Sequence, residues 1–200
     1  YWSEKKRKEE LKMAAGRMAF SFSPDGDNSL LSSLGVLKLF SKGYGRKAYN
    51  IIKGEMDRIH WTVFDYRYTV GGGRSSTTYS QTVACAQLDV DLPKFSLGAE
   101  SFFHKLGDVL GYKDIDFKSS PVFSDRYLLK GPDEASVRKL FTPEILTFFE
   151  NRKDIINIEA AGSRIIIYRN NKKVNPDDMR SFISEASKIA RMFAKDKGTF

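Results

Sequence analysis

The sequence IHWTVFDYRYTV occupies residues 59–70 and is followed, after the segment GGGRSS, by TTYSQTVACAQLDV at residues 77–90. Both runs are rich in β-branched and aromatic residues, which favour extended strands. The glycine- and serine-rich segment between them is typical of a hairpin turn. A symmetric hairpin places Phe64 opposite Val83, Tyr66 opposite Gln81, and Tyr68 opposite Tyr79. The two runs therefore predict a pair of antiparallel strands.

The first of these strands carries bulky apolar side chains on both of its faces. Successive side chains of a strand point to opposite sides. One face presents Phe64, Tyr66 and Tyr68, and the other presents Trp61, Val63, Asp65 and Arg67. We therefore expect a central strand that is covered on both sides. If Asp65 and Arg67 are buried there, each needs a polar partner.

Residues 48–56, just before these two runs, predict a further strand. The three strands then form a meander that ends at Leu92 and Pro93. Before it, we expect a helix at residues 3–20 and a short strand at residues 36–40. After it, apolar spacing predicts helices at residues 99–110 and from residue 131 onward, with a restart at Thr142. Further short strands are expected at residues 115–117 and 126–130, a hairpin at 155–168, and a last helix capped by Asn175 and Pro176.

This order of elements indicates an α+β fold, in which a mostly antiparallel sheet, the β-meander, packs with amphipathic helices. With 200 residues, 15 Phe and 9 Tyr, the chain can bury a core of its own. We expect residues 1–20 to form a juxtamembrane amphipathic helix and residues 21–92 a β-meander subdomain. Residues 93–200 are then a helix-rich α+β subdomain that forms one compact unit with the meander.

The chain carries 33 Lys and Arg residues against 25 Asp and Glu, a net charge of +8, and part of this excess lies at its start. Tyr1 and Trp2 are followed by the cationic residues Lys5, Lys6, Arg7 and Lys8. Aromatic residues followed by a basic cluster are typical of the cytoplasmic end of a membrane helix. Because the sequence begins with Tyr1, we expect an apolar run of about 20 residues just before it. The alternative is an ordinary charged helix start, stabilised by pairs such as Glu4 with Lys8.

A second basic segment, KGYGRK at residues 42–47, contains Lys42, Arg46 and Lys47 around one tyrosine. Glycines let a ligand approach the backbone, and the cations favour an anionic headgroup, a nucleic acid or an acidic partner. The alternative is a basic loop at a sheet edge, where lysine discourages aggregation.

No arrangement of residues in the sequence predicts catalysis. Cys85 lies among small residues in a strand, and neither His60 nor His104 has the spacing of a metal ligand. The glycines at residues 71–73 join two strands, whereas a phosphate-binding loop precedes a helix. The closely spaced acids are interpreted as solubilising pairs, Asp89 with Asp91 and Asp114 with Asp116. We therefore predict no metal ion and no cofactor.

Several phrases of the sequence resemble a family. They are LFSKGYGRKAYN (39–50), VFDYRY (63–68), QTV (81–83), FSDRY (123–127) and DEASVRKLFTP (133–143). Over roughly residues 11–193 the chain resembles a set of uncharacterised prokaryotic membrane-anchored proteins, in which a soluble domain follows one or two hydrophobic segments. The resemblance implies a membrane anchor. It implies no activity, because none is established for the group.

Three functions follow from these observations. The leading interpretation is a non-enzymatic, cytoplasmic domain of a membrane-anchored protein, which binds a protein partner or an anionic lipid surface. The second is an enzyme acting on a small or lipid-like substrate through carboxylate, Arg and Tyr side chains. The third is nucleic-acid binding through the basic segments.

Overall fold

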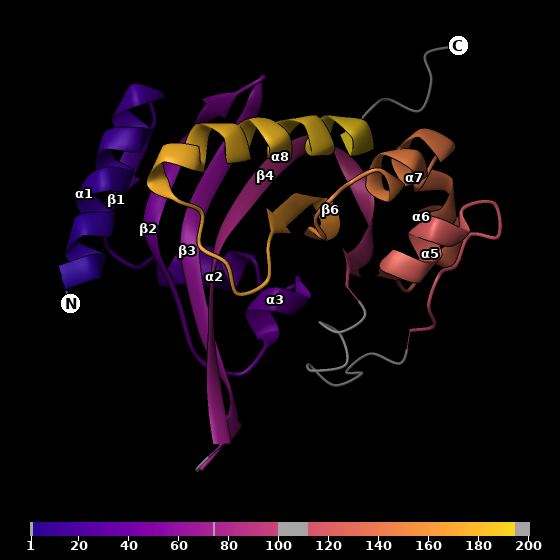
Figure 1. The fold of residues 1–200 in the computed structure, drawn as a ribbon, viewed down its shortest axis with the longest axis horizontal. Helices are drawn as coiled ribbons and strands as arrows, with labels where there is room; N and C mark the ends of the chain where they lie inside the picture. The colour runs from indigo at the N-terminus through magenta and orange to yellow at the C-terminus, as the bar shows by residue number, and fades with distance from the viewer. Residues whose placement is uncertain (1, 74, 100–111, 195–200) are drawn as a thin grey trace.

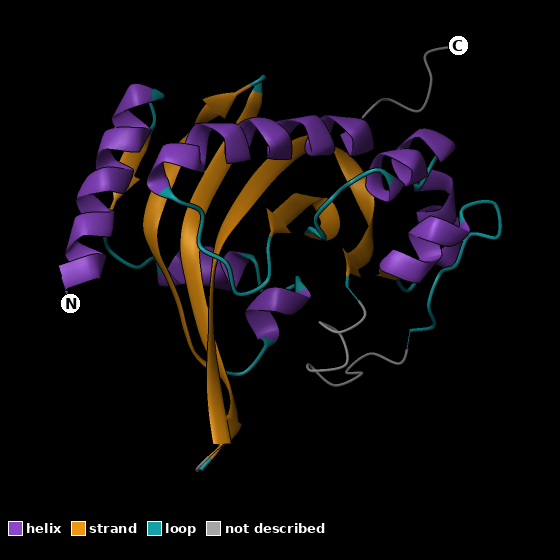
Figure 2. Ribbon diagram, viewed as in Figure 1, coloured by secondary structure: helices purple, strands orange, loops and turns teal. Residues whose placement is uncertain are grey.

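The structure, a computed structural model, describes residues 2–73, 75–99 and 112–194. Its described strands form one six-stranded antiparallel sheet in the order β1-β2-β3-β4-β5, with β6 also paired to β4. Helix α8 crosses one face of this sheet, and the short helices α2 and α3 lie against the other (Figures 1 and 2). The expected α+β class with an antiparallel sheet is confirmed.

The meander consists of β2 (Tyr44–Met56), β3 (Ile59–Gly72) and β4 (Ser75–Gly98). The register of the second hairpin is the predicted one, with Phe64 opposite Val83 and Tyr68 opposite Tyr79. The first hairpin turns at Asp57 and Arg58, whose positive φ angles of 55° and 62° are those of a tight two-residue turn.

Strand β4 does not end at Leu92 and Pro93, as we expected, but continues to Gly98. Irregular pairing on either side of Leu92 lets it bend instead of stopping. The hairpin expected at residues 155–168 is also wrong, because β6 (Asn157–Tyr168) is one strand. Gly162, with a φ of 59°, lies opposite Leu92 at this irregularity. A glycine that signals a turn in the sequence therefore forms a bulge, since β4 pairs with both halves of β6.

The chain enters the sheet through α1 (Trp2–Arg17), β1 (Ser21–Ser23), α2 (Asn28–Ser33) and α3 (Lys38–Ser41). The strand expected at residues 36–40 is wrong, because α3 occupies most of this segment. Its helical turn buries the consecutive residues Leu39 and Phe40 under the sheet, whereas a strand would point them to opposite sides.

Helices α5, α6 and α7 gather at the far end of the sheet from α1, and α8 runs from near α1 toward that end (Figure 1). The helix expected at residues 99–110, with His104, falls on residues outside the described ranges. We expected a short strand at residues 115–117, but the structure has an isolated bridge just before it, from Asp114 to Lys130. The elements are α5 (Pro121–Arg126), β5 (Leu128–Lys130), α6 (Glu134–Leu140), α7 (Pro143–Glu150), the 3₁₀ turn η1 (Pro176–Asp178) and α8 (Met179–Ala194).

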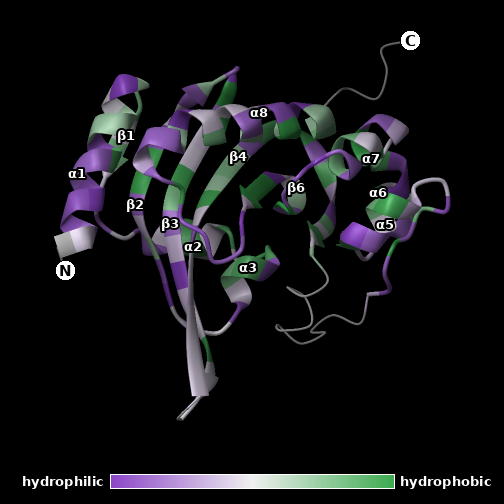
Figure 3. Cartoon of the chain, in the orientation of Figure 1, coloured by the Kyte–Doolittle hydropathy of each residue, from purple (hydrophilic) through white to green (hydrophobic). Residues whose placement is uncertain are grey.

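Apolar side chains cover both faces of the central strands, as the alternation in β3 predicted. Trp61 and Val63 pack in the larger core beneath α8, whereas Phe64, Tyr66 and Tyr68 pack in a second core with α2 and α3. All five side chains are buried. The hydropathy colours show apolar residues along the strands and a mostly hydrophilic α1 (Figure 3). None of the helices in the described ranges is both long and apolar enough to cross a bilayer.

The ring of Phe20 packs directly on Gly54 of β2, where a Cβ would overlap the ring atoms. We expect Gly54→Ala to lower the free energy of unfolding by about 1–3 kcal/mol, the usual cost of overpacking. Urea denaturation measures it. Gly16→Ala is the matched control, because nothing lies near its Cβ position on α1, and we expect it to stabilise the protein by about 0.5–1 kcal/mol. Equal effects of the two substitutions would contradict this packing.

Candidate functional site

Asp65, buried at 1% exposure in the middle of β3, is the centre of a polar cluster beneath α1. Both of its carboxylate oxygens accept hydrogen bonds from Arg7, from Nε and from Nη2, each at 2.8 Å. The Thr82 hydroxyl donates to Oδ1 at 2.8 Å, and the Asn50 amide donates to Oδ2 at 3.0 Å. The partner that this acid needs when buried is therefore an arginine from the start of the chain.

This cluster ties the first helix to the sheet. Arg7 also donates to the carbonyl of Val174 at 2.9 Å, and Lys173 pairs with Glu4 at 2.7 Å. Burial works against the charged guanidinium, but the hydrogen bonds and the charge of Asp65 outweigh it and raise the pKa of Arg7. The first two turns of α1 are consequently held from both sides, by β3 and by the segment before α8.

The four cations predicted near the N-terminus do not share one surface. Lys5 and Lys6 are exposed, Lys8 is half-buried, and Lys6 lies 3.6 Å from Glu10. Arg7 points inward to Asp65, so its role is structural. Sequence spacing alone gave no sign of this, because the pair spans 58 residues.

The basic segment at residues 42–47 is similarly divided. Its glycines adopt positive φ angles at the start of β2, and Arg46 donates to the carbonyl of Phe40 at 3.0 Å. Arg46 and Lys47 are exposed. The ammonium group of Lys42 is buried, and this burial lowers its pKa to about 8, with Lys38 adding to the effect and Glu159 opposing it.

Glu159 is a second buried acid, at 4% exposure on β6. The hydroxyl of Tyr168 donates to Oε1 at 3.0 Å, and the backbone N–H of Leu39 donates to Oε2 at 3.2 Å. Burial, together with the charge of Glu159, raises the pKa of Tyr168 well above its ordinary value. This acid therefore joins α3 to β6 on the face opposite α8.

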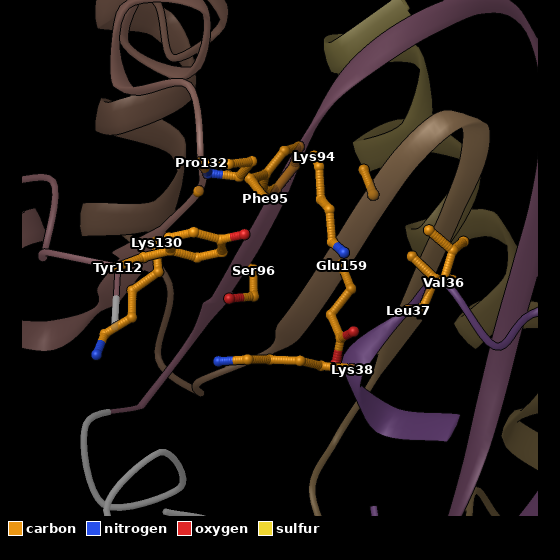
Figure 4. Close-up of a pocket in the computed structure, with 12 residues that line it drawn as sticks. Val36, Leu37, Lys38, Lys94, Phe95, Ser96, Tyr112, Lys130, Pro132 and Glu159 are labelled. Carbon is orange, nitrogen blue, oxygen red and sulfur yellow. The ribbon is translucent and has the colours of Figure 1, made fainter. Parts of the chain in front are cut away.

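A small pocket lies beside Glu159, with a cavity volume of about 20 Å³ that is partly open to solvent. Lys38 and Tyr112 point into the space in front of Ser96, and Lys94 reaches in from the rim (Figure 4). Lys130 turns away from them, and its ammonium lies 3.4 Å from Asp114. The sequence did not predict this site because its residues come from five separate segments. The available signal was Glu159, a carboxylate inside an apolar run.

The other residues considered for chemistry are not brought together. Burial raises the pKa of Cys85 to about 11, which disfavours the reactive thiolate. His60 is exposed and lies 3.5 Å from Glu55. Asp89 and Asp91 are exposed, and the glycines at residues 71–73 lie at the end of the β3–β4 hairpin. Within residues 2–73, 75–99 and 112–194, no group of three or more His, Cys, Asp or Glu side chains is placed to hold a metal ion.

Comparison with known proteins finds a solved structure with a similar fold. No protein-family model and no curated protein matches the chain. A solved structure, the crystal structure of the mycobacterial trehalose monomycolate transport factor A, is similar with a TM-score of 0.64 and 12% sequence identity. The match covers 94% of this chain and 92% of the other. At this identity the likeness shows a shared fold and carries no site residue across.

Replacing Arg7 with Met leaves Asp65 buried without its cation, and we expect a loss of about 3–5 kcal/mol in the free energy of unfolding. Asp65→Asn in the same background should recover part of the loss, because the uncompensated charge is removed. Lys6→Met, one position away on the same helix, should change stability by less than about 0.5 kcal/mol. Chemical denaturation measures all four proteins, and a small effect of Arg7→Met would contradict the anchoring of α1.

The buried ammonium of Lys42 predicts a dependence of stability on pH. Its pKa is about 8 in the folded protein against 10.5 for an ordinary lysine. Between these values the unfolded chain binds more protons, so this group makes stability rise with pH. From pH 7.5 to 9.5 we expect wild type to gain about 2 kcal/mol relative to Lys42→Met. The exposed Lys47→Met is the control. If the difference in the free energy of unfolding between wild type and Lys42→Met stays constant with pH, the burial of this ammonium is contradicted.

Proposed function

We propose that this chain is a non-enzymatic domain that acts at an anionic membrane surface, tethered on the cytoplasmic side by a segment that precedes it. The observation that carries the proposal is the exposure of Lys5 and Lys6, with Lys8 beside them, on a helix whose start is held in place through Arg7 and Asp65. Each cation close to an anionic lipid surface contributes roughly 1 kcal/mol to the free energy of binding. Holding the helix start in the folded protein lowers the entropy that binding must overcome.

The second exposed basic group lies close to the first. Lys47 and Arg67 are cross-strand partners on β2 and β3, and both are exposed. Arg67 is two residues from Asp65 on the same strand, so the two side chains share a face. Two residues of strand span roughly 7 Å, and Arg7 of α1 reaches Asp65 on that face. The helix start and this part of the sheet edge therefore support one cationic surface, defined by Lys5, Lys6, Lys8, Lys47 and Arg67.

The similar solved structure adds support for an accessory role, since that protein is a trehalose monomycolate transport factor. The placement of the polar side chains favours binding over catalysis. The thiol of Cys85 is buried, His60 lies at the exposed end of a hairpin, and the two buried acids are engaged in the fold. These observations support the proposal that this chain binds at a membrane and assists a process there.

We expect the protein to bind vesicles of phosphatidylglycerol and phosphatidylcholine at low salt, and pure phosphatidylcholine vesicles hardly at all. Replacing Lys5, Lys6 and Lys8 with Ser should weaken binding to the anionic vesicles roughly tenfold or more, since each cation contributes about 1 kcal/mol. Adding Lys47→Ser and Arg67→Ser should weaken it further. Raising the salt to about 0.5 M should abolish it, because the attraction is screened. Vesicle sedimentation measures each case.

The matched control is a triple Ser variant of the exposed Lys113, Lys118 and Lys139. They belong to α6 and to the segment before α5, and these helices lie at the end of the molecule away from α1 (Figure 1). It removes the same charge, and we expect it to bind anionic vesicles nearly as well as wild type. Equal loss in both triple variants would mean that net charge alone drives binding. Equal retention on neutral and anionic vesicles would discard the membrane proposal in favour of a protein partner, for which the protruding β3–β4 ribbon is the candidate surface (Figure 1).

A further inference from the structure

The part of β4 that lies in the protruding ribbon has one edge without a partner strand. On one side, β3 pairs with β4 along the whole ribbon, and on the other side β6 pairs with it only from Val83 onward. Among the strands that the structure describes, none pairs with Ser75–Tyr79 on that second side, and we call this stretch the free edge. Its residues are exposed apart from the half-buried Tyr79, and the ribbon projects from the body of the molecule (Figure 1).

The neighbouring contacts show which backbone groups of the free edge face outward. The N–H groups of Ser80 and Thr82 point away from β3, because both donate to the segment that follows β6. The register of β4 with β3 is regular here, so every second residue points its N–H and C=O groups the same way. The backbone groups of Ser76 and Thr78 therefore face outward. Such a row of donors and acceptors is a template for another strand.

The free edge has none of the features by which proteins usually prevent strands from pairing. Those features are charged side chains, proline and bulges. Ser75–Tyr79 has no charge, no proline and a regular register. The outer edge at the start of β2 is different, although β1 pairs only with Ile51–Lys53 beyond it. That stretch carries the exposed Arg46 and Lys47 and two glycines with positive φ angles. One open edge is thus protected, and the other is not.

The sequence of the free edge favours a second copy of this chain as the added strand. When two copies run antiparallel around Thr77, Ser76 of one lies opposite Thr78 of the other. Both residues face outward, so each such pair exchanges its two backbone hydrogen bonds. Charge supports the same occupant. Each copy carries a net charge of +8 and repels the other, and an uncharged edge that projects from the body lets two copies approach with little repulsion.

We propose that two copies of this protein associate through their free edges, so that their ribbons form one continuous antiparallel sheet with a two-fold axis at Thr77. Tyr79, whose ring stacks on Tyr68 at 5.3 Å, then lies opposite Ser75 of the second copy. The contact takes only the residues of Ser75–Tyr79 from each copy, whereas a standard interface takes roughly 20–30 from each side. The dimer is therefore weak and reversible in solution.

The first test is sedimentation equilibrium of wild type at concentrations up to about 1 mM, where we expect a monomer–dimer equilibrium. Thr77→Lys places like charges opposite each other at the axis and should weaken the dimer about fivefold or more. Gly72→Lys is the matched control. It adds the same charge to the ribbon on β3, with open space at its Cβ position, and should dimerise nearly as wild type does.

A mixture of Thr77→Lys and Thr77→Asp separates a direct contact from a folding defect. Opposite charges then meet at the axis, and we expect the mixture to dimerise at least as well as wild type although Thr77→Lys alone does not. Circular dichroism establishes that each variant is folded. The triple Ser variant of Lys5, Lys6 and Lys8 should still dimerise, and added salt should strengthen the dimer by screening, whereas it abolishes vesicle binding. The dimer and the membrane surface can therefore fail independently.

A covalent trap tests the register. Directly opposite residues in a pair without mutual hydrogen bonds have Cα atoms about 4.5 Å apart, which suits a disulfide. Thr77→Cys should therefore form a cross-linked dimer on mild oxidation, and Gly72→Cys should form much less, while the native Cys85 is buried. The proposal is overturned if wild type stays monomeric throughout, if the two Lys variants dimerise equally, if the mixture does not restore the dimer, or if the two Cys variants cross-link equally.

Discussion

The ion pair between Arg7 and Asp65 is the interaction on which the arrangement of this protein depends. A carboxylate in the middle of a covered sheet is costly unless it is paired and fully hydrogen-bonded. Asp65 meets that requirement with donors from α1, β2 and β4, and Arg7 extends the network to Val174 before α8. The first helix therefore lies where Arg7 can reach Asp65, and that position decides which of its cations face the solvent.

Glu159 imposes a similar constraint on the opposite face of the sheet. It accepts hydrogen bonds from Tyr168 and from the backbone of Leu39, which holds α3 against β6. The two acids differ in their surroundings. The charge of Asp65 is matched by a bidentate arginine in a closed cluster, whereas Glu159 lies at the side of a pocket with several lysines. The first arrangement stabilises the fold through a paired charge, and the second does so through hydrogen bonds to the acid.

The similarity to trehalose monomycolate transport factor A shows that two very different sequences can form this fold. At 12% identity the shared features are the layers of sheet and helices, which many different apolar residues can build. Function resides in sites that are placed on a fold. For this chain the relevant features are its own: the lysines on the solvent face of α1, the pair Lys47 and Arg67, and the free edge of β4.

The sequence by itself determined the meander. Alternation in residues 59–90 and one glycine-rich turn specify both the pairing and the register of β3 with β4, because neighbours in such a hairpin are close along the chain. The sequence also indicated that Asp65 needs a partner. Only the tertiary structure decided that the partner is Arg7, that Gly162 forms a bulge in β6, and that residues 38–41 turn as a helix. It alone assembled the small pocket beside Glu159. These features depend on contacts between residues as far apart as 58 and 120 positions, and local patterns carry no information about which distant segments meet.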